Sequence, residues 1–214
     1  KLEEIPQKIT ILTHVNPDGD AIGSSLALLN TLSLIGHQCK IYIPNDYPLF
    51  LKWLPGNDNI FVFNNDTSSA IQQIKASDII FFLDFNDIKR IKQIHKPVSE
   101  SSAFIALVDH HPDPDLDADC IISDTSVSST GELIYRLINK IGLKDKINKD
   151  IATCLFAAIM TDTGCFSYNS SSPETYKIVA ALLKYGIDKD RIYYRIYDNF
   201  SFDRMRLLGL GLNA

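Results

Sequence analysis

The sequence predicts an α/β fold in which helices flank a mostly parallel β-sheet. Three observations favour this class. Short runs rich in β-branched residues alternate with loops and helical patterns, which is typical of repeated βαβ units. The run from Ile79 to Leu83 is apolar throughout, as strands are when helices cover both faces of a parallel sheet. The chain has 214 residues, 45% of them hydrophobic, which is enough for one domain with a sizeable core.

The first half of the chain predicts strands separated by loops and one long helix. Runs of strand length are found at Lys8 to Thr13, Lys40 to Ile43, Ile60 to Phe63, Ile79 to Leu83 and Phe104 to Val108. Apolar residues recur at helical spacing after Asp20. A helix is therefore expected from Asp20 to Gly36, with Gly36 as the left-handed residue that ends it.

Helical patterns dominate the second half. They cover Ser129 to Ile141 and Lys149 to Thr161, and a further helical region runs from Asp188 to Gly211. Another helix is expected to begin with Ser172 as its N-cap and Pro173 at its first position. Gly186 is predicted as the residue that follows its end.

Composition and charge narrow the class of protein. A formal net charge of −5 argues against a broad basic surface that grips long nucleic acid. No run approaches the roughly 18 apolar residues of a membrane helix, and Lys1 to Pro6 lacks the apolar core of a signal peptide. We therefore expect a cytoplasmic protein that does not bind membranes. The four cysteines form no C-x-x-C pair and are expected to be reduced core residues, whereas His37 and His95 are expected at the surface.

Aspartate and histidine residues gather at the ends of predicted strands and helices. The clusters are His14, Asp18 and Asp20 after the first strand, Asp84 with Asp87 after the fourth, Asp109-His110-His111 after the fifth, and Asp162 at a helix end. One such Asp is more often an N-cap or turn residue. Because ligands bind outside the carboxyl ends of parallel strands, the clusters are expected to converge on one crevice. Carboxylates gathered there would repel one another unless cations lay among them, and mixed oxygen and imidazole ligands suit Mn²⁺ better than a structural zinc site.

The motifs that carry these residues resemble those of the DHH phosphoesterase superfamily. They are His14-x-x-x-Asp18-x-Asp20-Ala21-x-Gly23-Ser24, Asp84, Asp109-His110-His111 and Thr161-Asp162-Thr163. Within that superfamily the chain is similar to the branch of bifunctional oligoribonucleases and 3′-phosphoadenosine-5′-phosphate phosphatases. The residues behind this second resemblance are Asn16 to Ala21, Ser128 to Glu132 and Thr161 to Phe166. Members of the family carry a smaller, substrate-gripping C-terminal domain. The resemblance therefore implies a catalytic domain over residues 1–187 and a helical linker over 188–214, leading toward a domain that this sequence lacks.

The resemblance also implies a set of site residues. It places one metal on His14 and Asp18 and the other on Asp20, His110 and Asp162, with Asp84 bridging both. Two Mn²⁺ ions are the expected cofactors, with Mg²⁺ or Co²⁺ as alternatives, and hydroxide shared between them would attack phosphorus. Three residues are expected to act in catalysis: His111 facing the substrate, Asp109 supporting one of the histidines, and Asp84. The stretch from Ser128 to Gly131 is predicted to start a helix, and hydroxyl groups near the site are left open.

The substrate implied by the resemblance is a short RNA, a dinucleotide or 3′-phosphoadenosine-5′-phosphate, cleaved to mononucleotides. Cyclic di-AMP hydrolysis is a close variant. A family II inorganic pyrophosphatase would share the metal plan but needs a basic C-terminal motif that these 214 residues lack. A processive exonuclease on long DNA is disfavoured because the sequence shows no basic groove. A nucleotide-binding module without turnover is the alternative from another class, and a homodimer is left open as the oligomeric state.

Overall fold

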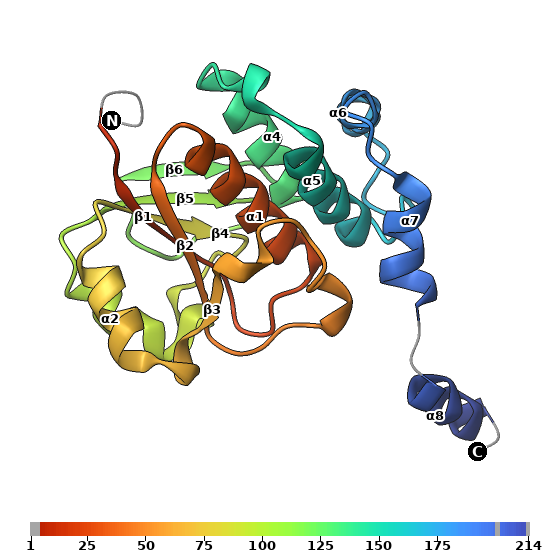
Figure 1. Cartoon of the computed structure of the whole chain (residues 1–214), viewed down its shortest axis with the longest axis horizontal. Helices are drawn as coiled ribbons and strands as arrows, with labels where there is room; N and C mark the ends of the chain where they lie inside the picture. The colour runs from red at the N-terminus through yellow and green to blue at the C-terminus, as the bar shows by residue number, and fades with distance from the viewer. Residues whose placement is uncertain (1–4, 200–201, 213–214) are drawn as a thin grey trace.

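The computed structural model describes residues 5–199 and 202–212 and is built on a six-stranded, all-parallel sheet with helices on both faces (Figure 1). The strand order is β3-β2-β1-β4-β5-β6. The strands are β1 (Lys8–Leu12), β2 (Gln38–Ile43), β3 (Ile60–Val62), β4 (Ile79–Leu83), β5 (Phe104–Asp109) and β6 (Cys120–Ser123). The main helices are α1 (Gly19–Leu34), α2 (Thr67–Lys75), α3 (His95–Ser99), α4 (Thr130–Lys140), α5 (Lys149–Asp162), α6 (Pro173–Leu183), α7 (Lys189–Tyr193) and α8 (Phe202–Leu212). The predicted fold class is confirmed.

The central strands send alternate side chains into two separate cores. In β4, Phe81 and Leu83 face the core beneath α1, α4 and α5, whereas Ile80 and Phe82 face the core beneath α2 and α3. All of these side chains are buried. Burying one large apolar side chain contributes roughly 1.5–3 kcal/mol, so the helices on both faces stabilise the sheet.

The helices α1, α4 and α5, which cover one face of the sheet, approach one another at Ala158 in α5. A Cβ atom added to Gly131, in the first turn of α4, would lie 2.6 Å from the Cβ of Ala158 and 3.2 Å from Oδ1 of Asp20 in α1. Real Cβ atoms do not approach so closely, so glycine is required at this position. The close approach sets the first turn of α4 against the start of α1.

Most predicted helix ends are found where they were expected. Ser129 caps α4, and Ser172 caps α6 with Pro173 at its first position. Helix α1 begins at Gly19, one residue before the expected Asp20, and Asp18 is its N-cap. Gly36 follows α1 with a φ of 94°. The α6 helix ends at Leu183, before the predicted end, because the next three N–H groups bond carbonyls three residues back; left-handed Gly186 follows this tighter turn.

Four other features differ from expectation or were missed. Strand β6 and helix α2 were not predicted. Cys120 lies exposed on the edge strand β6, although Cys39 and Cys154 are buried as expected. His37 is also buried rather than exposed, since its Nδ1 accepts a hydrogen bond from the backbone N–H of Gln7.

The segment after residue 187 is helical in its described part. Helix α7 continues into a π-helical turn at Tyr194–Asp198, and α8 buries none of its residues. The division at residue 187 and the role of 188–214 as a linker remain predictions, and Asn213 and Ala214 lie outside the described residues. No helix found in residues 5–199 or 202–212 has the length and apolar character to cross a membrane.

The order of the strands creates a switch point between β1 and β4. From β1 the chain moves outward to β2 and β3, and it then returns to β4 on the other side of β1. In open parallel sheets, ligands bind at the carboxyl ends of the strands where the direction reverses in this way. The loops after β1 and β4 therefore line the expected crevice.

Candidate metal centre

The strand ends place three of the predicted clusters side by side. His14 follows β1, Asp84 follows β4, and His110 follows β5, whose last residue is Asp109. His14 and Asp84 are almost fully buried, at 3% and 2% exposure. Asp84 has a φ of 67°, a left-handed conformation that is uncommon outside glycine and is found at functional sites.

The first turn of α1 supplies two further carboxylates. Oδ1 of Asp18 accepts hydrogen bonds from the N–H groups of Asp20 (3.1 Å) and Ala21 (3.0 Å), as an N-cap does. Gly19, between Asp18 and Asp20, lies against α5, because a Cβ on Gly19 would be 2.4 Å from the Thr161 hydroxyl. This contact brings the Asp18-Gly19-Asp20 turn next to Asp162.

The first turn of α4 holds the Asp20 carboxylate with two main-chain N–H groups. The N–H of Thr130 donates to Asp20 Oδ2 (2.6 Å), and the N–H of Gly131 donates to Asp20 Oδ1 (2.9 Å). These are donors that a helix leaves unpaired at its N-terminus. The Thr130 hydroxyl donates to Asp84 Oδ1 (3.0 Å), so the same turn touches a second carboxylate.

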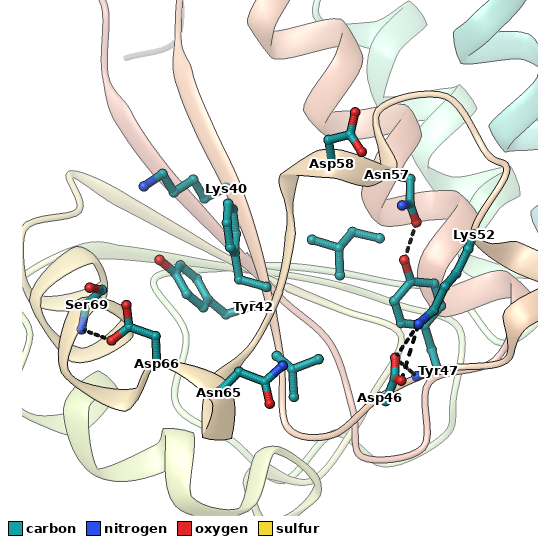
Figure 2. Close-up of a pocket in the computed structure, with 13 residues that line it drawn as sticks. Lys40, Tyr42, Asp46, Tyr47, Lys52, Asn57, Asp58, Asn65, Asp66 and Ser69 are labelled. Atoms are coloured by element: carbon teal, nitrogen blue, oxygen red, sulfur yellow. Dashed lines mark hydrogen bonds and ion pairs between the residues drawn. The ribbon is translucent and has the colours of Figure 1, made fainter.

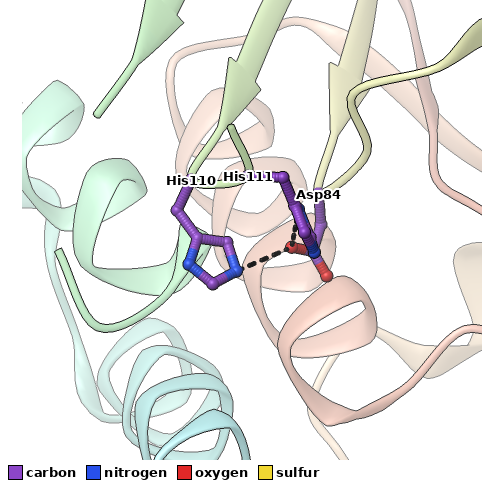
Figure 3. Close-up of side chains that lie close together, drawn as sticks. All are labelled: Asp84, His110 and His111. Carbon is purple, nitrogen blue, oxygen red and sulfur yellow. Dashed lines mark ion pairs between the residues drawn. The ribbon is translucent and has the colours of Figure 1, made fainter. Parts of the chain in front are cut away.

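The six predicted metal ligands form two adjoining groups. Ligand atoms of His14, Asp18 and Asp84 lie within 4.8 Å of one another, and so do those of Asp20, His110 and Asp162. Asp84 lies between the groups, with Oδ2 3.6 Å from Nε2 of His14 and Oδ1 3.6 Å from Nε2 of His110. Figure 3 shows Asp84 with the two histidines that follow β5, and ligand atoms of these three residues also lie within 4.8 Å of one another. The structure therefore brings all six residues together.

Asp109 supports His111 and does not contact the imidazole of His110 among the contacts described. Its Oδ1 lies 2.7 Å from Nδ1 of His111. Its Oδ2 is buried and has no hydrogen-bond partner within the described residues. The sequence left open which histidine Asp109 serves, and the geometry answers that question. The His111 side chain is 33% exposed, and its Nε2 has no hydrogen-bond partner among the residues that the structure describes.

The carboxylates of the second group resist ionisation. Burial, followed by the charges of Asp84 and Asp162, raises the pKa of Asp20 well above its usual range. Burial, followed by the charges of Asp84 and Asp18, raises the pKa of Asp162 to about 7. Asp162 also ends α5, where the helix dipole disfavours a negative charge. A cation bound here would offset the repulsion between these carboxylates and the unfavourable helix dipole at Asp162.

Neighbouring groups and burial shift the pKa values of Asp84 and of the site histidines. Burial would raise the pKa of Asp84, but hydrogen bonding to His14 and the charges of the three site histidines outweigh it and lower this pKa. Burial would lower the pKa of His14, yet Asp84 raises it. Burial lowers the pKa of His110. The hydrogen bond to Asp109 raises the pKa of His111.

The donor set fits divalent cations. It consists of carboxylate oxygens and imidazole nitrogens, and in the described part of the chain no Lys or Arg forms an ion pair with Asp18, Asp20, Asp84 or Asp162. Nδ1 of His14 lies 2.8 Å from the carbonyl oxygen of Val15, which fixes this ring with Nε2 toward the site. Bound cations would neutralise these carboxylates, which no Lys or Arg of the described residues pairs with.

Two residues near the site were not predicted as site residues. Thr130 was predicted as part of a helix start, with a hydroxyl near the site left open, because the bond from its hydroxyl to Asp84 depends on how α4 lies on the sheet. Arg90 is the other. Its carbonyl accepts from the N–H of Val15 (2.8 Å), and its positive charge lowers the pKa values of His14 and His111 slightly.

A large cavity elsewhere on the molecule does not include the metal-binding groups. It has a volume of about 660 Å³ and lies around the edge strand β3 (Figure 2). Asp46 pairs there with Lys52, and the Tyr47 hydroxyl bonds Asn57. Acidic and basic side chains are mixed in its wall, so its charge identifies no ligand class.

Fold and site together define a class: a parallel α/β domain with a carboxylate–histidine metal centre at its strand ends. The chain belongs to the DHH family, because the model of the DHH family N-terminal domain matches residues 8–159. Phosphoesterases of this family are metal-dependent hydrolases. The resemblance seen in the sequence motifs is thereby confirmed at the level of the family.

Several known proteins are similar to this chain. The bifunctional oligoribonuclease and PAP phosphatase NrnA of Thermus thermophilus is 31% identical over 91% of this chain and 56% of its own length. The protein of the same name from Bacillus subtilis is 28% identical over 89% of this chain and 57% of its own length. A crystal structure of an exopolyphosphatase-related protein from Bacteroides fragilis matches 96% of this chain and 61% of its own, with 42% identity and a TM-score of 0.94. The chain thus spans about half the length of these curated relatives.

Proposed function

We propose that this chain is the catalytic part of a Mn²⁺-dependent phosphoesterase. Its substrates would be short oligoribonucleotides or dinucleotides and 3′-phosphoadenosine-5′-phosphate, hydrolysed to mononucleotides. The observation that carries the proposal is the pair of adjoining His/Asp groups joined by Asp84. The names of the relatives from Thermus thermophilus and Bacillus subtilis support the substrate class.

The proposed ligands follow the two groups. His14 and Asp18 would hold one cation, Asp20, His110 and Asp162 the other, and Asp84 both. Oxygen and imidazole ligands without thiolate suit Mn²⁺, with Mg²⁺ or Co²⁺ as alternatives. When bound, two such cations would lower the pKa of a water molecule and neutralise charge on the phosphoryl oxygens.

His111 is proposed as the proton donor. Hydrolysis adds the hydroxyl of water to phosphorus, breaks the P–O ester bond and leaves an oxygen that needs a proton. Asp109 holds Nδ1 of His111 and raises its pKa, which favours a protonated imidazole near neutral pH. Nε2 of this partly exposed side chain can then give a proton to the leaving oxygen. Asp109 acts through His111 and orients its ring.

Arg90 supports an anionic substrate. The net charge of the chain is −5, so a phosphate group needs local positive charge. The guanidinium of Arg90 acts on both His14 and His111 and belongs to a side chain that is only partly buried. It places a permanent cation beside the two groups.

The test compares hydrolysis by wild-type protein with that of Asp84→Asn and of the matched control Asp87→Asn. Asp87 is an acidic neighbour that caps the following 3-10 helix and belongs to neither metal group. Release of nucleotide or phosphate from a short RNA, 3′-phosphoadenosine-5′-phosphate, cyclic di-AMP and pyrophosphate is measured with Mn²⁺ and with chelator.

Mn²⁺-dependent hydrolysis of the RNA and the bisphosphorylated nucleotide, lost in Asp84→Asn and kept in Asp87→Asn, is the expected result. Cleavage of pyrophosphate alone would instead identify a family II pyrophosphatase, and preference for cyclic di-AMP would identify the cyclic dinucleotide as the substrate. Nucleotide binding with no turnover of any substrate would identify a binding module.

A further inference from the structure

The first turn of α4 touches carboxylates that come from two different parts of the fold. Asp20 belongs to α1 and Asp84 follows β4, and each lies in a different metal group. Thr130 bonds both of them: its N–H donates to Asp20 Oδ2 (2.6 Å) and its hydroxyl to Asp84 Oδ1 (3.0 Å). Thr130 itself is fully buried.

We infer that Thr130 is a positioning residue that fixes the Asp84 carboxylate so that one oxygen faces each metal group. The inference rests on the proposed function and deepens it. With Oδ1 held by the hydroxyl on the side of His110, Oδ2 is directed toward His14. Without the hydroxyl, rotation of this carboxylate would be opposed by fewer contacts, and both groups would lose a preorganised ligand.

Thr130 is held in place because further hydrogen bonds fix the first turn of α4. Ser129 caps the helix by accepting from the N–H of Glu132 (3.2 Å). The buried carboxylate of Glu132 accepts from the N–H (3.3 Å) and hydroxyl (3.0 Å) of Ser128 and from the hydroxyl of Thr175 in α6 (3.0 Å). A side chain fixed in this way can orient its partners, whereas a mobile one would follow them.

The experiment removes the hydroxyl and measures binding of Mn²⁺ alone. Thr130→Val removes the hydroxyl but keeps the shape of the side chain and the N–H that holds Asp20. Thr130→Ala also removes the hydroxyl and leaves a smaller side chain that is well suited to a helix. Thr130→Ser retains the hydroxyl. Thr31→Val is the matched control, because Thr31 is also fully buried but its hydroxyl bonds only the carbonyl of Ala27 within α1 (2.8 Å).

Free Mn²⁺ is followed by electron paramagnetic resonance as metal-free protein is titrated, and urea unfolding of each metal-free variant is measured beside it. We expect Thr130→Val and Thr130→Ala to weaken Mn²⁺ binding by about 10-fold or more, the scale on which groups behind the ligands affect affinity. The Mn²⁺ affinities of Thr130→Ser and Thr31→Val should stay within about threefold of wild type, which is smaller than the change of about 10-fold expected for the other two variants.

Either hydroxyl-free variant binding Mn²⁺ as wild type does would overturn the inference and leave the proposed function intact. The inference is also overturned if Thr31→Val weakens binding as much as Thr130→Val, since the effect would then be general destabilisation. Failure of the wild-type protein to bind Mn²⁺ would contradict the proposed function itself, so the two failures are distinguishable.

Discussion

The contact between Gly131 and Ala158 leads to a prediction about stability. In Gly131→Ala, the new methyl group would lie 2.6 Å from the Cβ of Ala158. Carbon atoms prefer about 3.5–4.0 Å, so α4 and α5 must separate by about 1 Å. Overpacking of this kind costs about 1–3 kcal/mol, and better helix propensity returns about 0.5–1 kcal/mol. The expected net loss in the free energy of unfolding is about 1 kcal/mol, near the middle of a range of about 0–2.5 kcal/mol.

Urea denaturation of the metal-free protein measures this loss. With a slope of about 2–3 kcal/mol per molar urea, the midpoint should fall by roughly 0.5 M. Mn²⁺ binding should weaken too, because the displaced turn carries the two N–H groups that hold Asp20. Gly211→Ala is the control, since a Cβ at Gly211 meets nothing within 4 Å.

A double mutant tests whether the contact is the cause. Ala158→Gly removes the methyl group against which the new one would collide, so Gly131→Ala should cost less in that background by about 1 kcal/mol, more than the deviation of about 0.3–0.5 kcal/mol seen for independent sites. Additive effects within that deviation would refute the reasoning.

Further predictions concern the site and its support. His111→Asn should lower kcat by about 10²–10⁴-fold with little change in Mn²⁺ affinity; an equal loss of affinity would make His111 a ligand. Asp109→Asn should lower the pKa of His111, followed by NMR titration of the metal-free protein, and an unchanged titration would contradict the pairing. Glu132→Ala should lose about 3 kcal/mol of stability in urea, about 1 for each of its three bonds to Ser128 and Thr175, with a further contribution from its ion pair with the partly exposed Arg136; a loss near zero would show that these contacts add nothing. Because the pKa of Asp162 rises from 3.8 to about 7, the folded metal-free protein keeps a proton that the unfolded chain has released, so its Tm should fall as pH rises between these values. Saturating Mn²⁺ should remove this fall, and a Tm that rises over the same range in the metal-free protein would contradict it.

The sequence was most informative where burial and chain direction determine structure. The apolar run of β4 and the Asp and His residues at strand ends predicted both the sheet and the crevice, since parallel strands end on the same edge. Strand β6 was missed because it has four residues, three of them exposed, and so lacks a buried pattern. Helix α2 buries only Ala70 and Ile74, although Asp66 before it was a usable N-cap signal.

Some details of the site depend on tertiary placement and could not be predicted. His110 and His111 are neighbours in sequence, yet one meets Asp84 through Nε2 and the other meets Asp109 through Nδ1, a choice made by side-chain rotamers. The bond from Thr130 to Asp84 joins residues 46 positions apart and depends on how α4 lies on the sheet. His37 is likewise buried and bonded to Gln7, a residue 30 positions away in the sequence.

The site is assembled from the ends of β1, β4 and β5 and from three helix ends, and its residues extend from His14 to Asp162. An unfolded chain therefore offers no preformed site, and binding is linked to folding of the whole domain. The apparent dissociation constant is the intrinsic one divided by the folded fraction. A core mutation far from any ligand can thus mimic a binding defect in a marginally folded variant. Affinities of variants are comparable only after each has been corrected for the fraction of molecules that is folded.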